Sequence, residues 1–364
     1  MGRMPRIRGM LLEDYSAEQN KKNLFENRAC GFRQGKEYQI IMEKTEIPVI
    51  DVIIPAYRPD DSFRKLIRLL LEQSVKPHHI YVLQTIEDGE TVMQPLDQRM
   101  TVHPILKKEF DHGATRDYGA RLAAEGFAEK IPQHYLLFMT QDAVPAGTDL
   151  LERLVKPFED DRTAITYARQ LAREGADLLE RLTRIHNYPP EDQVKSKADL
   201  ERLGIKTYFC SDVCAMYRLD RYMEQGGFVH PTIFNEDMIM ASRMIQAGYQ
   251  VAYCGSAEVI HSHNYSCMQQ FHRNFDLGVS QKQYREVFES ISSEKEGAGY
   301  AKSTLLYLLK RGKPGKAFYF ALQCGFKLFG YKLGKNYDHL PRKLVLWCTM
   351  TPGYVLFHQN DGKC

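Results

Sequence analysis

Short apolar segments of strand length alternate with segments of helical periodicity through the first half of this chain. Residues 49–54 (Val-Ile-Asp-Val-Ile-Ile) are mostly β-branched and end at Pro55, and residues 63–70 repeat Phe, Leu and Ile at helical spacing. A continuous apolar run of this length is typical of a strand that is buried on both faces of a parallel sheet. The alternation therefore predicts an α/β fold built from βαβ units.

The same patterning continues along the chain. Further strands are expected at residues 80–83, 102–106, 135–139, 164–167, 215–217, 250–253 and 258–260, and further helices at 114–124, 149–158 and 236–247. Ser62 and Thr148 are the expected N-caps of the helices that follow them. Residues 171–206 have a charged, helical pattern, which we interpret as an insertion that shapes a substrate pocket.

Composition and motif content exclude several classes of protein. The 364 residues include 49 Lys and Arg against 46 Asp and Glu, whereas a general nucleic-acid binder usually carries a larger basic excess. No Gly-x-Gly-x-x-Gly or Gly-x-x-x-x-Gly-Lys-Ser/Thr motif follows a predicted strand, which disfavours dinucleotide-binding and P-loop proteins. The eight cysteines include no Cys-x-x-Cys pair and no signal peptide is visible, so we expect reduced thiols and a cytoplasmic location.

The C-terminal part of the chain differs in charge from the rest. Residues 301–364 contain 11 Lys and Arg and 2 Asp and Glu, a net charge of +9. The apolar runs 318–326 and 344–357 are shorter than the ~18 residues that cross a bilayer. Apolar segments flanked by lysines indicate a surface that lies on an anionic membrane, here the inner face of the cell membrane. Packing of the apolar face on the catalytic domain or on a second subunit of a homodimer is the alternative.

Three regions are predicted along the chain. Residues 1–46 lack clear periodicity and form either an N-terminal arm or, if Met42 is the natural start, a translated leader. Residues 47–280 contain the alternating strands and helices and are the expected catalytic domain. Residues 281–364 are the expected helical, basic C-terminal region.

Polar side chains follow the predicted strands, where α/β proteins bind their ligands. Asp142 follows the strand 135–139, either as a ligand of a divalent cation or in an Asx turn before Pro145. Glu236 and Asp237 begin a predicted helix. Their carboxylates either stabilise the positive end of the helix dipole or include a general base that deprotonates an acceptor hydroxyl.

Two histidines follow the last predicted strand. His261 and His263 are two residues apart, which places both side chains on the same side if the strand continues. A lone histidine is more often structural. Together with the upstream Asp142, however, the pair is a candidate set of metal ligands.

Several separated motifs occur in a defined order. They are Pro55-Ala56-Tyr57, Phe110-Asp111-His112-Gly113-Ala114-Thr115-Arg116, Met139-Thr140-Gln141-Asp142-Ala143, Tyr167-Ala168-Arg169-Gln170, Asn187-Tyr188-Pro189, Glu236-Asp237 and His261-Ser262-His263-Asn264-Tyr265. With these motifs the chain resembles glycosyltransferase family 2 over about residues 47–280, and the finer pattern resembles its bacterial rhamnosyltransferase branch. The resemblance implies a GT-A fold, which is a Rossmann-like, nucleotide-sugar-binding mixed sheet flanked by helices, followed here by a helical basic C-terminal region.

The resemblance also implies roles for individual residues. Asp237 is implied as the catalytic base, with Glu236 beside it. Arg116 is either a further cation of the site or a solvated or structural arginine. The implied donor-binding residues are Pro55, Ala56, Tyr57, Thr85, His112, Arg116, Gln141 and Asp142. The implied ligands of Mg²⁺ or Mn²⁺ are Asp142, His261 and His263, with His261 preferred over His263.

Two positions depart from the family pattern. Thr140 replaces the first carboxylate of the Asp-x-Asp position, so the need for a metal is left open. The pair Gln84-Thr85 stands where many relatives carry an Asp that reads the base of the donor nucleotide, so the base is also left open.

The implied activity is an inverting transfer of L-rhamnose from dTDP-L-rhamnose to a hydroxyl of a growing, lipid-linked cell-surface polysaccharide. Two alternatives remain. A catalytically inactive glycan-binding or scaffold protein on the same fold is favoured by Thr140. A sugar nucleotidyltransferase is disfavoured because no Gly-rich, basic loop follows residues 49–54.

Overall fold

The computed structural model describes residues 48–127, 131–289 and 294–358. All described residues belong to one compact unit. The predicted N-terminal arm or leader lies outside the described residues. The boundary predicted after residue 280 falls within helix α8 (Cys267–Gln283), and a division there stays a prediction.

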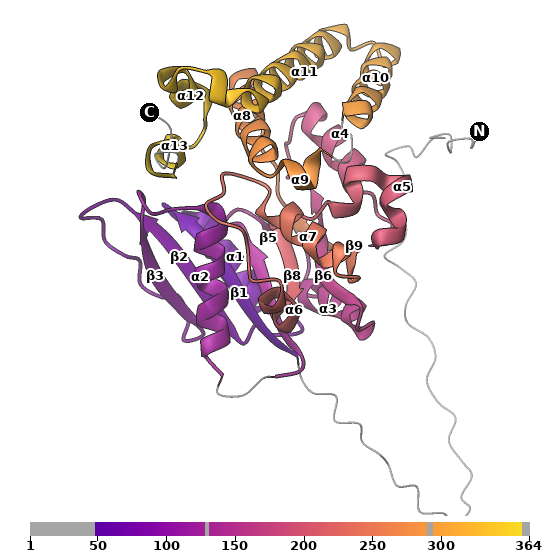
Figure 1. Ribbon diagram of the computed structural model, residues 1–364. Coiled ribbons are helices and arrows are strands. Elements are labelled where there is room, and N and C mark those ends of the chain that lie inside the picture. Colours follow the sequence, from indigo (N-terminus) through magenta and orange to yellow (C-terminus); the bar gives the residue numbers. More distant parts are fainter. Residues whose placement is uncertain (1–47, 128–130, 290–293, 359–364) are drawn as a thin grey trace, which may run out of the picture. The chain divides into compact units, whose positions relative to one another are not determined.

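Among the described residues, nine strands form one mixed sheet (Figure 1). They are β1 (Val49–Tyr57), β2 (His79–Ile86), β3 (Met100–Leu106), β4 (His134–Met139), β5 (Val144–Pro145), β6 (Thr163–Leu171), β7 (Gln193–Lys195), β8 (Cys214–Arg218) and β9 (Gln250–Ile260). The order is β3-β2-β1-β4-β8-β6-β9-β5, and β7 also pairs with β9. Strands β1 to β4 run parallel, whereas β8 is antiparallel to both of its neighbours. The mixed α/β sheet implied by the resemblance is therefore present.

Strand β1 is longer than its sequence predicts. Ile50, Val52 and Ile53 are fully buried, as expected for a strand covered on both faces. The predicted end at Pro55 is wrong, because the strand continues to Tyr57. On one side, strand β2 pairs with β1 as far as Tyr57. On the other side, strand β4 pairs only as far as Ile53, so the missing N–H of Pro55 costs no hydrogen bond to β4.

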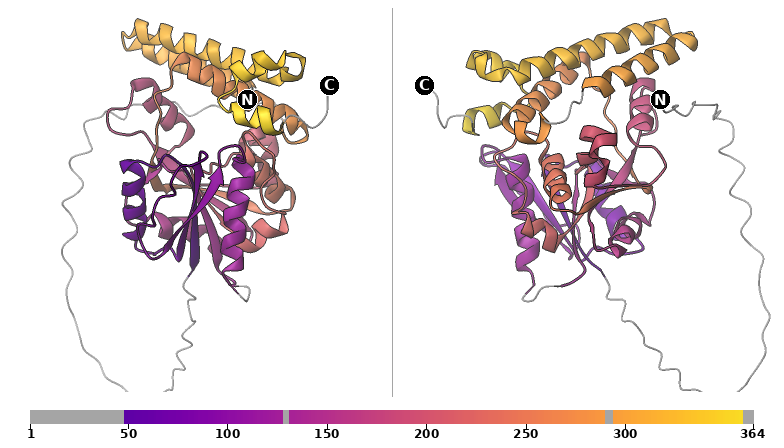
Figure 2. Two further views of the ribbon diagram at one scale, coloured as in Figure 1. Left: turned by 90° about the vertical axis from the view of Figure 1, so that its left-hand side faces the viewer. Right: turned by 45° about the vertical axis from the view of Figure 1, so that its right-hand side comes forward.

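Helices cover both faces of the sheet. In the first two thirds of the described chain they are α1 (Asp61–Leu71), α2 (His112–Glu125), α3 (Leu150–Val155), α4 (Leu178–Asn187), α5 (Leu200–Leu203), α6 (Leu219–Glu224) and α7 (Glu236–Gln246). The views show α1 and α2 on opposite faces of β1 and β2 (Figures 1 and 2). Alternate residues of β1 accordingly pack into two separate cores, with Ile54 on the side of α1 and Ile53 on the side of α2.

Both predicted N-caps are wrong. The side chain of Asp60 accepts hydrogen bonds from the backbone N–H groups of Ser62 and Phe63, so Asp60 caps α1 and Ser62 lies inside the helix. Asp149, not Thr148, occupies the cap position of α3 and makes no capping bond with its side chain. At α1, an aspartate two residues upstream of Ser62 competes directly with the hydroxyl residue for this role.

Two other segments differ from the prediction. Residues 171–206 contain the helices α4 and α5, as predicted, but also the end of β6 and the strand β7, which the helical pattern did not indicate. Residues 250–260 form the single strand β9 instead of two strands. The register of β9 against β6 shifts between Ala168, which pairs with Cys254, and Arg169, which pairs with Glu258, so an irregularity lies between the two predicted strands.

The C-terminal region is helical, as predicted. It contains α9 (Arg285–Phe288), α10 (Glu294–Lys310), α11 (Pro314–Lys335), α12 (Arg342–Cys348) and α13 (Pro352–His358). With α8, helices α11, α12 and α13 lie beyond the end of the sheet at which β1 terminates (Figures 1 and 2). A Cβ atom at Gly330 would lie 2.2 Å from the carbonyl oxygen of Phe271, so glycine allows α11 to approach α8 closely. No helix in the described parts of the chain is long and apolar enough to cross a membrane.

Candidate active site

The carboxyl ends of β1, β2 and β4 surround a cavity of about 440 Å³, here called the main cavity. Its wall includes seven of the eight predicted donor-binding residues: Pro55, Ala56, Tyr57, Thr85, His112, Arg116 and Gln141. The eighth, Asp142, belongs to the metal-ligand cluster described below. Small-molecule sites typically have volumes of about 300–1,000 Å³, so the main cavity has the size of a binding site.

The side chain of Gln141 holds the end of β1 in place. Its Oε1 accepts a hydrogen bond of 2.8 Å from the backbone N–H of Tyr57, and its Nε2 donates one of 3.1 Å to the carbonyl oxygen of Tyr57. These bonds replace the ladder that β4 no longer supplies beyond Ile53. Gln141 therefore shapes the wall of the main cavity by positioning Tyr57.

Thr140 has an unpaired hydroxyl group at the main cavity. It stands at the first position of the expected Asp-x-Asp motif and lines the cavity. Its Oγ1 is buried and has no hydrogen-bond partner among the described residues. Because a buried polar atom without a partner costs free energy, a polar group of a bound molecule is a favourable partner for this hydroxyl.

Lys107 adds a cation to the main cavity that the sequence analysis missed. It follows β3 and donates hydrogen bonds to Oε1 of Glu87 at 2.7 Å and to the phenol of Tyr57 at 3.1 Å. The Tyr57 hydroxyl in turn donates to Glu87 at 3.0 Å. Lys107 occupies a turn without a recognisable motif, so only the pairing of β2 with β3 brings it to the site.

The two carboxylates that begin α7 are brought to the buried end of α2. Arg116 is almost fully buried, and its Nη1 lies 3.1 Å from Oε1 of Glu236. The carboxylate of Asp237 accepts hydrogen bonds from the backbone N–H groups of Met238 at 2.7 Å and Asp212 at 3.2 Å. Arg116 lines the main cavity and therefore joins this group to the predicted donor-binding residues.

Asp212 is a third carboxylate of the site and is almost fully buried, and no motif in the sequence indicated it. It lies in the loop before β8, 3.7 Å from Nε of Arg116, and accepts a hydrogen bond of 2.7 Å from the Tyr217 hydroxyl. We call Asp212, Glu236 and Asp237 the acid cluster. Burial, followed by the charge of Asp237, holds the pKa of Asp212 well above its ordinary value. Burial and the charge of Glu236 raise the pKa of Asp237 to about 7.

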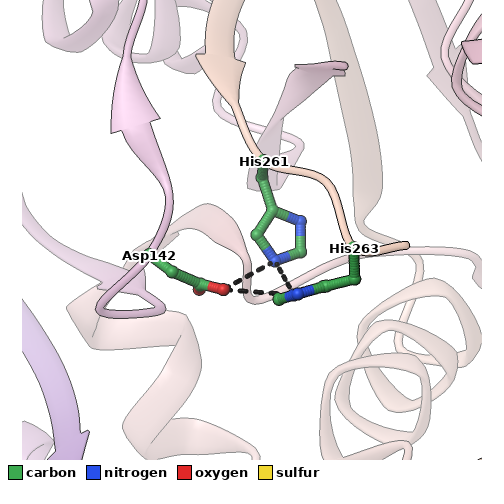
Figure 3. Close-up of side chains that lie close together, drawn as sticks. All are labelled: Asp142, His261 and His263. Atoms are coloured by element: carbon green, nitrogen blue, oxygen red, sulfur yellow. Dashed lines mark hydrogen bonds and ion pairs between the residues drawn. The ribbon is translucent and has the colours of Figure 1, made fainter. Parts of the chain in front are cut away.

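Asp142, His261 and His263 converge as predicted and are here called the Asp-His cluster (Figure 3). Nε2 of His263 lies 3.1 Å from Oδ2 of Asp142 and 3.0 Å from Nε2 of His261. Nε2 of His261 lies 3.5 Å from the same oxygen of Asp142. One ligand atom from each residue lies within 4.8 Å of the others. A carboxylate oxygen and two imidazole nitrogens at this spacing fit a divalent metal ion.

The protonation states of the cluster suit metal binding. Burial lowers the pKa of His261, which favours the neutral imidazole that binds metals. Burial alone would raise the pKa of Asp142, but hydrogen bonds from both histidines hold it well below its ordinary value. The site therefore combines the anionic oxygen of Asp142 with the neutral imidazole of His261.

Gln170 orients His261 and links the Asp-His cluster to the acid cluster. Its Oε1 accepts a hydrogen bond of 3.1 Å from Nδ1 of His261 and another from Arg184, which leaves Nε2 of His261 facing Asp142. Its Nε2 donates at 2.9 Å to the hydroxyl of Ser211, the residue before Asp212. Gln170 is the last residue of the Tyr-Ala-Arg-Gln motif. The sequence indicated this motif but not the role of Gln170.

The comparisons with known proteins agree with this geometry. Residues 51–224 match the model of glycosyl transferase family 2. O-antigen chain rhamnosyltransferase RfbN of Salmonella typhimurium is 36% identical over 314 residues, which cover 84% of this chain and 95% of that protein. O-antigen chain rhamnosyltransferase WbaN of Salmonella anatum is 34% identical over 317 residues, which cover 85% of this chain and 96% of that protein.

Solved structures give a weaker match. Mannosyltransferase PcManGT from Pyrobaculum calidifontis, in complex with GDP-Man and Mn²⁺, is 12% identical and superposes with a TM-score of 0.48, covering 88% of this chain and 89% of that one. The mixed sheet, together with the match to the family model, defines the protein as a glycosyltransferase of the GT-A class. The chain belongs to glycosyltransferase family 2.

Proposed function

We propose that the protein transfers L-rhamnose from dTDP-L-rhamnose to a hydroxyl of an O-antigen polysaccharide, with inversion at the anomeric carbon. The choice of sugar and polysaccharide is supported by the two relatives, which are O-antigen chain rhamnosyltransferases and align over almost their whole length. The mechanism is supported by one observation above all. Asp237 is a partly buried carboxylate with a raised pKa, joined through Glu236 and Arg116 to the main cavity.

The reaction is a single displacement. Asp237 accepts the proton of the acceptor hydroxyl, and the oxygen forms a bond to the anomeric carbon of the donor. The bond from that carbon to the diphosphate oxygen breaks, and the electron pair leaves with the nucleoside diphosphate. Attack from the side opposite the leaving group inverts the configuration. Arg116 and Lys107 contribute positive charge at the main cavity, where the diphosphate binds.

The donor site also holds a divalent cation in this proposal. Asp142 and His261, with His263 as the second imidazole, are the ligands. When bound, the ion supplies positive charge that stabilises the leaving diphosphate. Imidazole nitrogen is a poor ligand for Mg²⁺ but an acceptable one for Mn²⁺, so a site with two histidines favours Mn²⁺.

The acceptor is lipid-linked in this proposal, and the protein works at the inner face of the cell membrane. Three aromatic side chains of α11 and α12 are largely exposed: Phe318 by 75%, Phe329 by 62% and Trp347 by 58%. They belong to the region of the chain that carries a net charge of +9. Exposed aromatics among lysines suit a surface that contacts anionic lipid headgroups.

A donor panel tests the proposed function. Wild-type protein and Asp142→Ala are screened by thermal shift against dTDP-L-rhamnose, UDP-sugars and GDP-mannose, with and without Mn²⁺. We expect dTDP-L-rhamnose with Mn²⁺ to give the largest rise in melting temperature of the wild type, because a ligand that binds only the native state stabilises it. A larger shift with another nucleotide sugar would contradict the proposed donor. Rhamnosyl transfer to an isolated O-antigen acceptor, followed by NMR of the anomeric proton, then tests the inversion.

A further inference from the structure

A segment near the C-terminus completes the main cavity. Two residues of the link after α12 and the first three residues of α13 line this cavity together with residues of β1 and α2: Met350, Thr351, Pro352, Gly353 and Tyr354. We call them the C-terminal wall. They lie outside residues 51–224, the part that matches the family model, and outside the predicted catalytic domain. The cavity is thus closed by a region that the sequence placed apart from it.

A buried carboxylate of α8 fixes the start of the C-terminal wall. Oδ2 of Asp276 accepts a hydrogen bond of 2.9 Å from the backbone N–H of Met350 and one of 3.5 Å from the hydroxyl of Thr351. Asp276 is only 3% exposed, so this bond is protected from competition by water. Just before the wall, Nδ1 of His272 donates to the carbonyl oxygen of Cys348 at 2.8 Å.

The other end of the C-terminal wall is held by Tyr354. Its side chain is buried in the same apolar cluster as Phe275 of α8 and Ile233, which also lines the main cavity. The Tyr354 hydroxyl donates to Oε1 of Gln283 at 3.2 Å, near the end of α8. The wall is therefore attached to one helix at both ends.

Helix α8 also follows directly from the Asp-His cluster. Ser266 caps its N-terminus three residues after His263. The element that holds the C-terminal wall is thus continuous with the loop that supplies the two candidate metal ligands. This connection places the wall and the Asp-His cluster on one supporting unit.

The chemistry of the C-terminal wall complements the rest of the main cavity. Lys107, Arg116 and the unpaired hydroxyl of Thr140 offer charge and hydrogen bonds, which suit phosphate and sugar oxygens. The wall contributes a thioether, a proline ring, a phenol ring and a glycine, which present an extended, mostly apolar surface. Such a surface suits the planar face of a nucleobase.

We propose that the C-terminal wall covers the nucleoside of the donor, and that Asp276 is the positioning residue that holds the wall in place. The inference rests on the proposed function in one respect, namely that the ligand of the main cavity is a donor nucleotide. Removing the anchor opens one side of the site, so the affinity for the nucleotide falls while the acid cluster is untouched.

The first measurement compares two full-length variants by isothermal titration calorimetry with dTDP and Mn²⁺. Asp276→Ala removes the anchor. Asp338→Ala is the matched control. Asp338 follows α11 and forms an exposed ion pair with Lys282 of α8, the helix that carries Asp276, and this pair is not part of the wall. We expect the Kd for dTDP to rise about tenfold in Asp276→Ala, since a ligand that loses one wall of its site loses part of its burial. Asp338→Ala should bind like the wild type.

The second measurement keeps the wild-type protein and therefore does not depend on the folding of a variant. Hydrogen–deuterium exchange is followed on a peptide that covers residues 350–356, with and without saturating dTDP and Mn²⁺. Slower exchange with the nucleotide is expected, because a wall in contact with the ligand is protected. A purely structural role of the segment would leave its exchange unchanged.

The outcomes separate this inference from the proposed donor. If UDP or GDP binds and dTDP does not, the proposed donor is wrong, and the two measurements are made with the nucleotide that binds. If a nucleotide binds without protecting residues 350–356, or binds a folded Asp276→Ala with unchanged Kd, the C-terminal wall is not part of the donor site. If the wild type binds no nucleotide, both proposals are overturned.

Discussion

The backbone N–H of Asp212 donates a hydrogen bond of 3.2 Å to Oδ2 of Asp237. The N–H of Met238 donates to the other oxygen at 2.7 Å, so both oxygens of the Asp237 carboxylate are oriented by the backbone. Burial at the same time raises the pKa of Asp237 to about 7. A carboxylate that is both oriented and more basic than usual is suited to accept a proton near neutral pH.

Replacing Asp237 by Asn should abolish most of the transfer activity. The amide keeps the shape of the carboxylate but cannot accept the acceptor proton, and loss of a general base typically lowers kcat by ~10²–10⁴-fold. Donor binding should change little, because Asp237 does not line the main cavity. Steady-state transfer and nucleotide titration measure the two effects. Asp220→Asn, an exposed substitution on α6, is the control, and near-normal turnover of Asp237→Asn would falsify the assignment.

The pH profile should report the acid cluster. Below about pH 7 the Asp237 carboxyl keeps its proton and cannot act as a base, so kcat/KM should rise with pH through this range. Glu236 contributes to the raised pKa of Asp237 by like-charge repulsion. Glu236→Gln removes that charge, so the acidic limb of the profile should move to lower pH.

The control for the pH experiment is Glu224→Gln, which removes an exposed carboxylate of α6. Its acidic limb should coincide with that of the wild type. An unshifted limb in Glu236→Gln, in a variant that is folded and active, would count against Asp237 as the titrating group.

Removal of the metal should inactivate the protein reversibly. We expect EDTA to abolish transfer and Mn²⁺ to restore it more fully than Mg²⁺, since two of the three candidate ligands are imidazoles. Asp142→Ala should lower the affinity for Mn²⁺, measured by the EPR signal of free Mn²⁺ during titration. Asp88→Ala, at an exposed position after β2, serves as the control. Full activity in EDTA, or an unchanged Mn²⁺ affinity in Asp142→Ala, contradicts the metal assignment.

The sequence predicted the parts of the site that depend on strand ends. The apolar runs of β1 and β4 showed where each strand stops to within a few residues, and Asp142 follows β4. Pairing of Val144 in β5 with Ile260 in β9 then brings Asp142 beside His261. This proximity is a property of the sheet register, and the order of the motifs was enough to anticipate it.

The remaining parts of the site depend on packing that leaves no periodic trace in the sequence. Asp212 and Lys107 lie in connecting segments, where residue types are weakly constrained by secondary structure. The C-terminal wall reaches the main cavity only because α8 presents Asp276 to Met350, 74 residues away. Contacts of this kind require the tertiary structure.

The exposed aromatics of α11 and α12 should carry membrane binding. In flotation with vesicles that contain anionic lipid, we expect the wild type to bind and to be released by salt, because attraction between lysines and headgroups is screened. Phe318→Asp combined with Phe329→Asp should bind less, whereas Ile185→Asp on α4, at a side chain that is 67% exposed, should not differ from the wild type. The alternative is that a second subunit covers this surface, and sedimentation velocity tests it. In that case the wild type is a dimer, the Phe318 and Phe329 substitutions dissociate it, and the protein shows no salt-sensitive binding to vesicles.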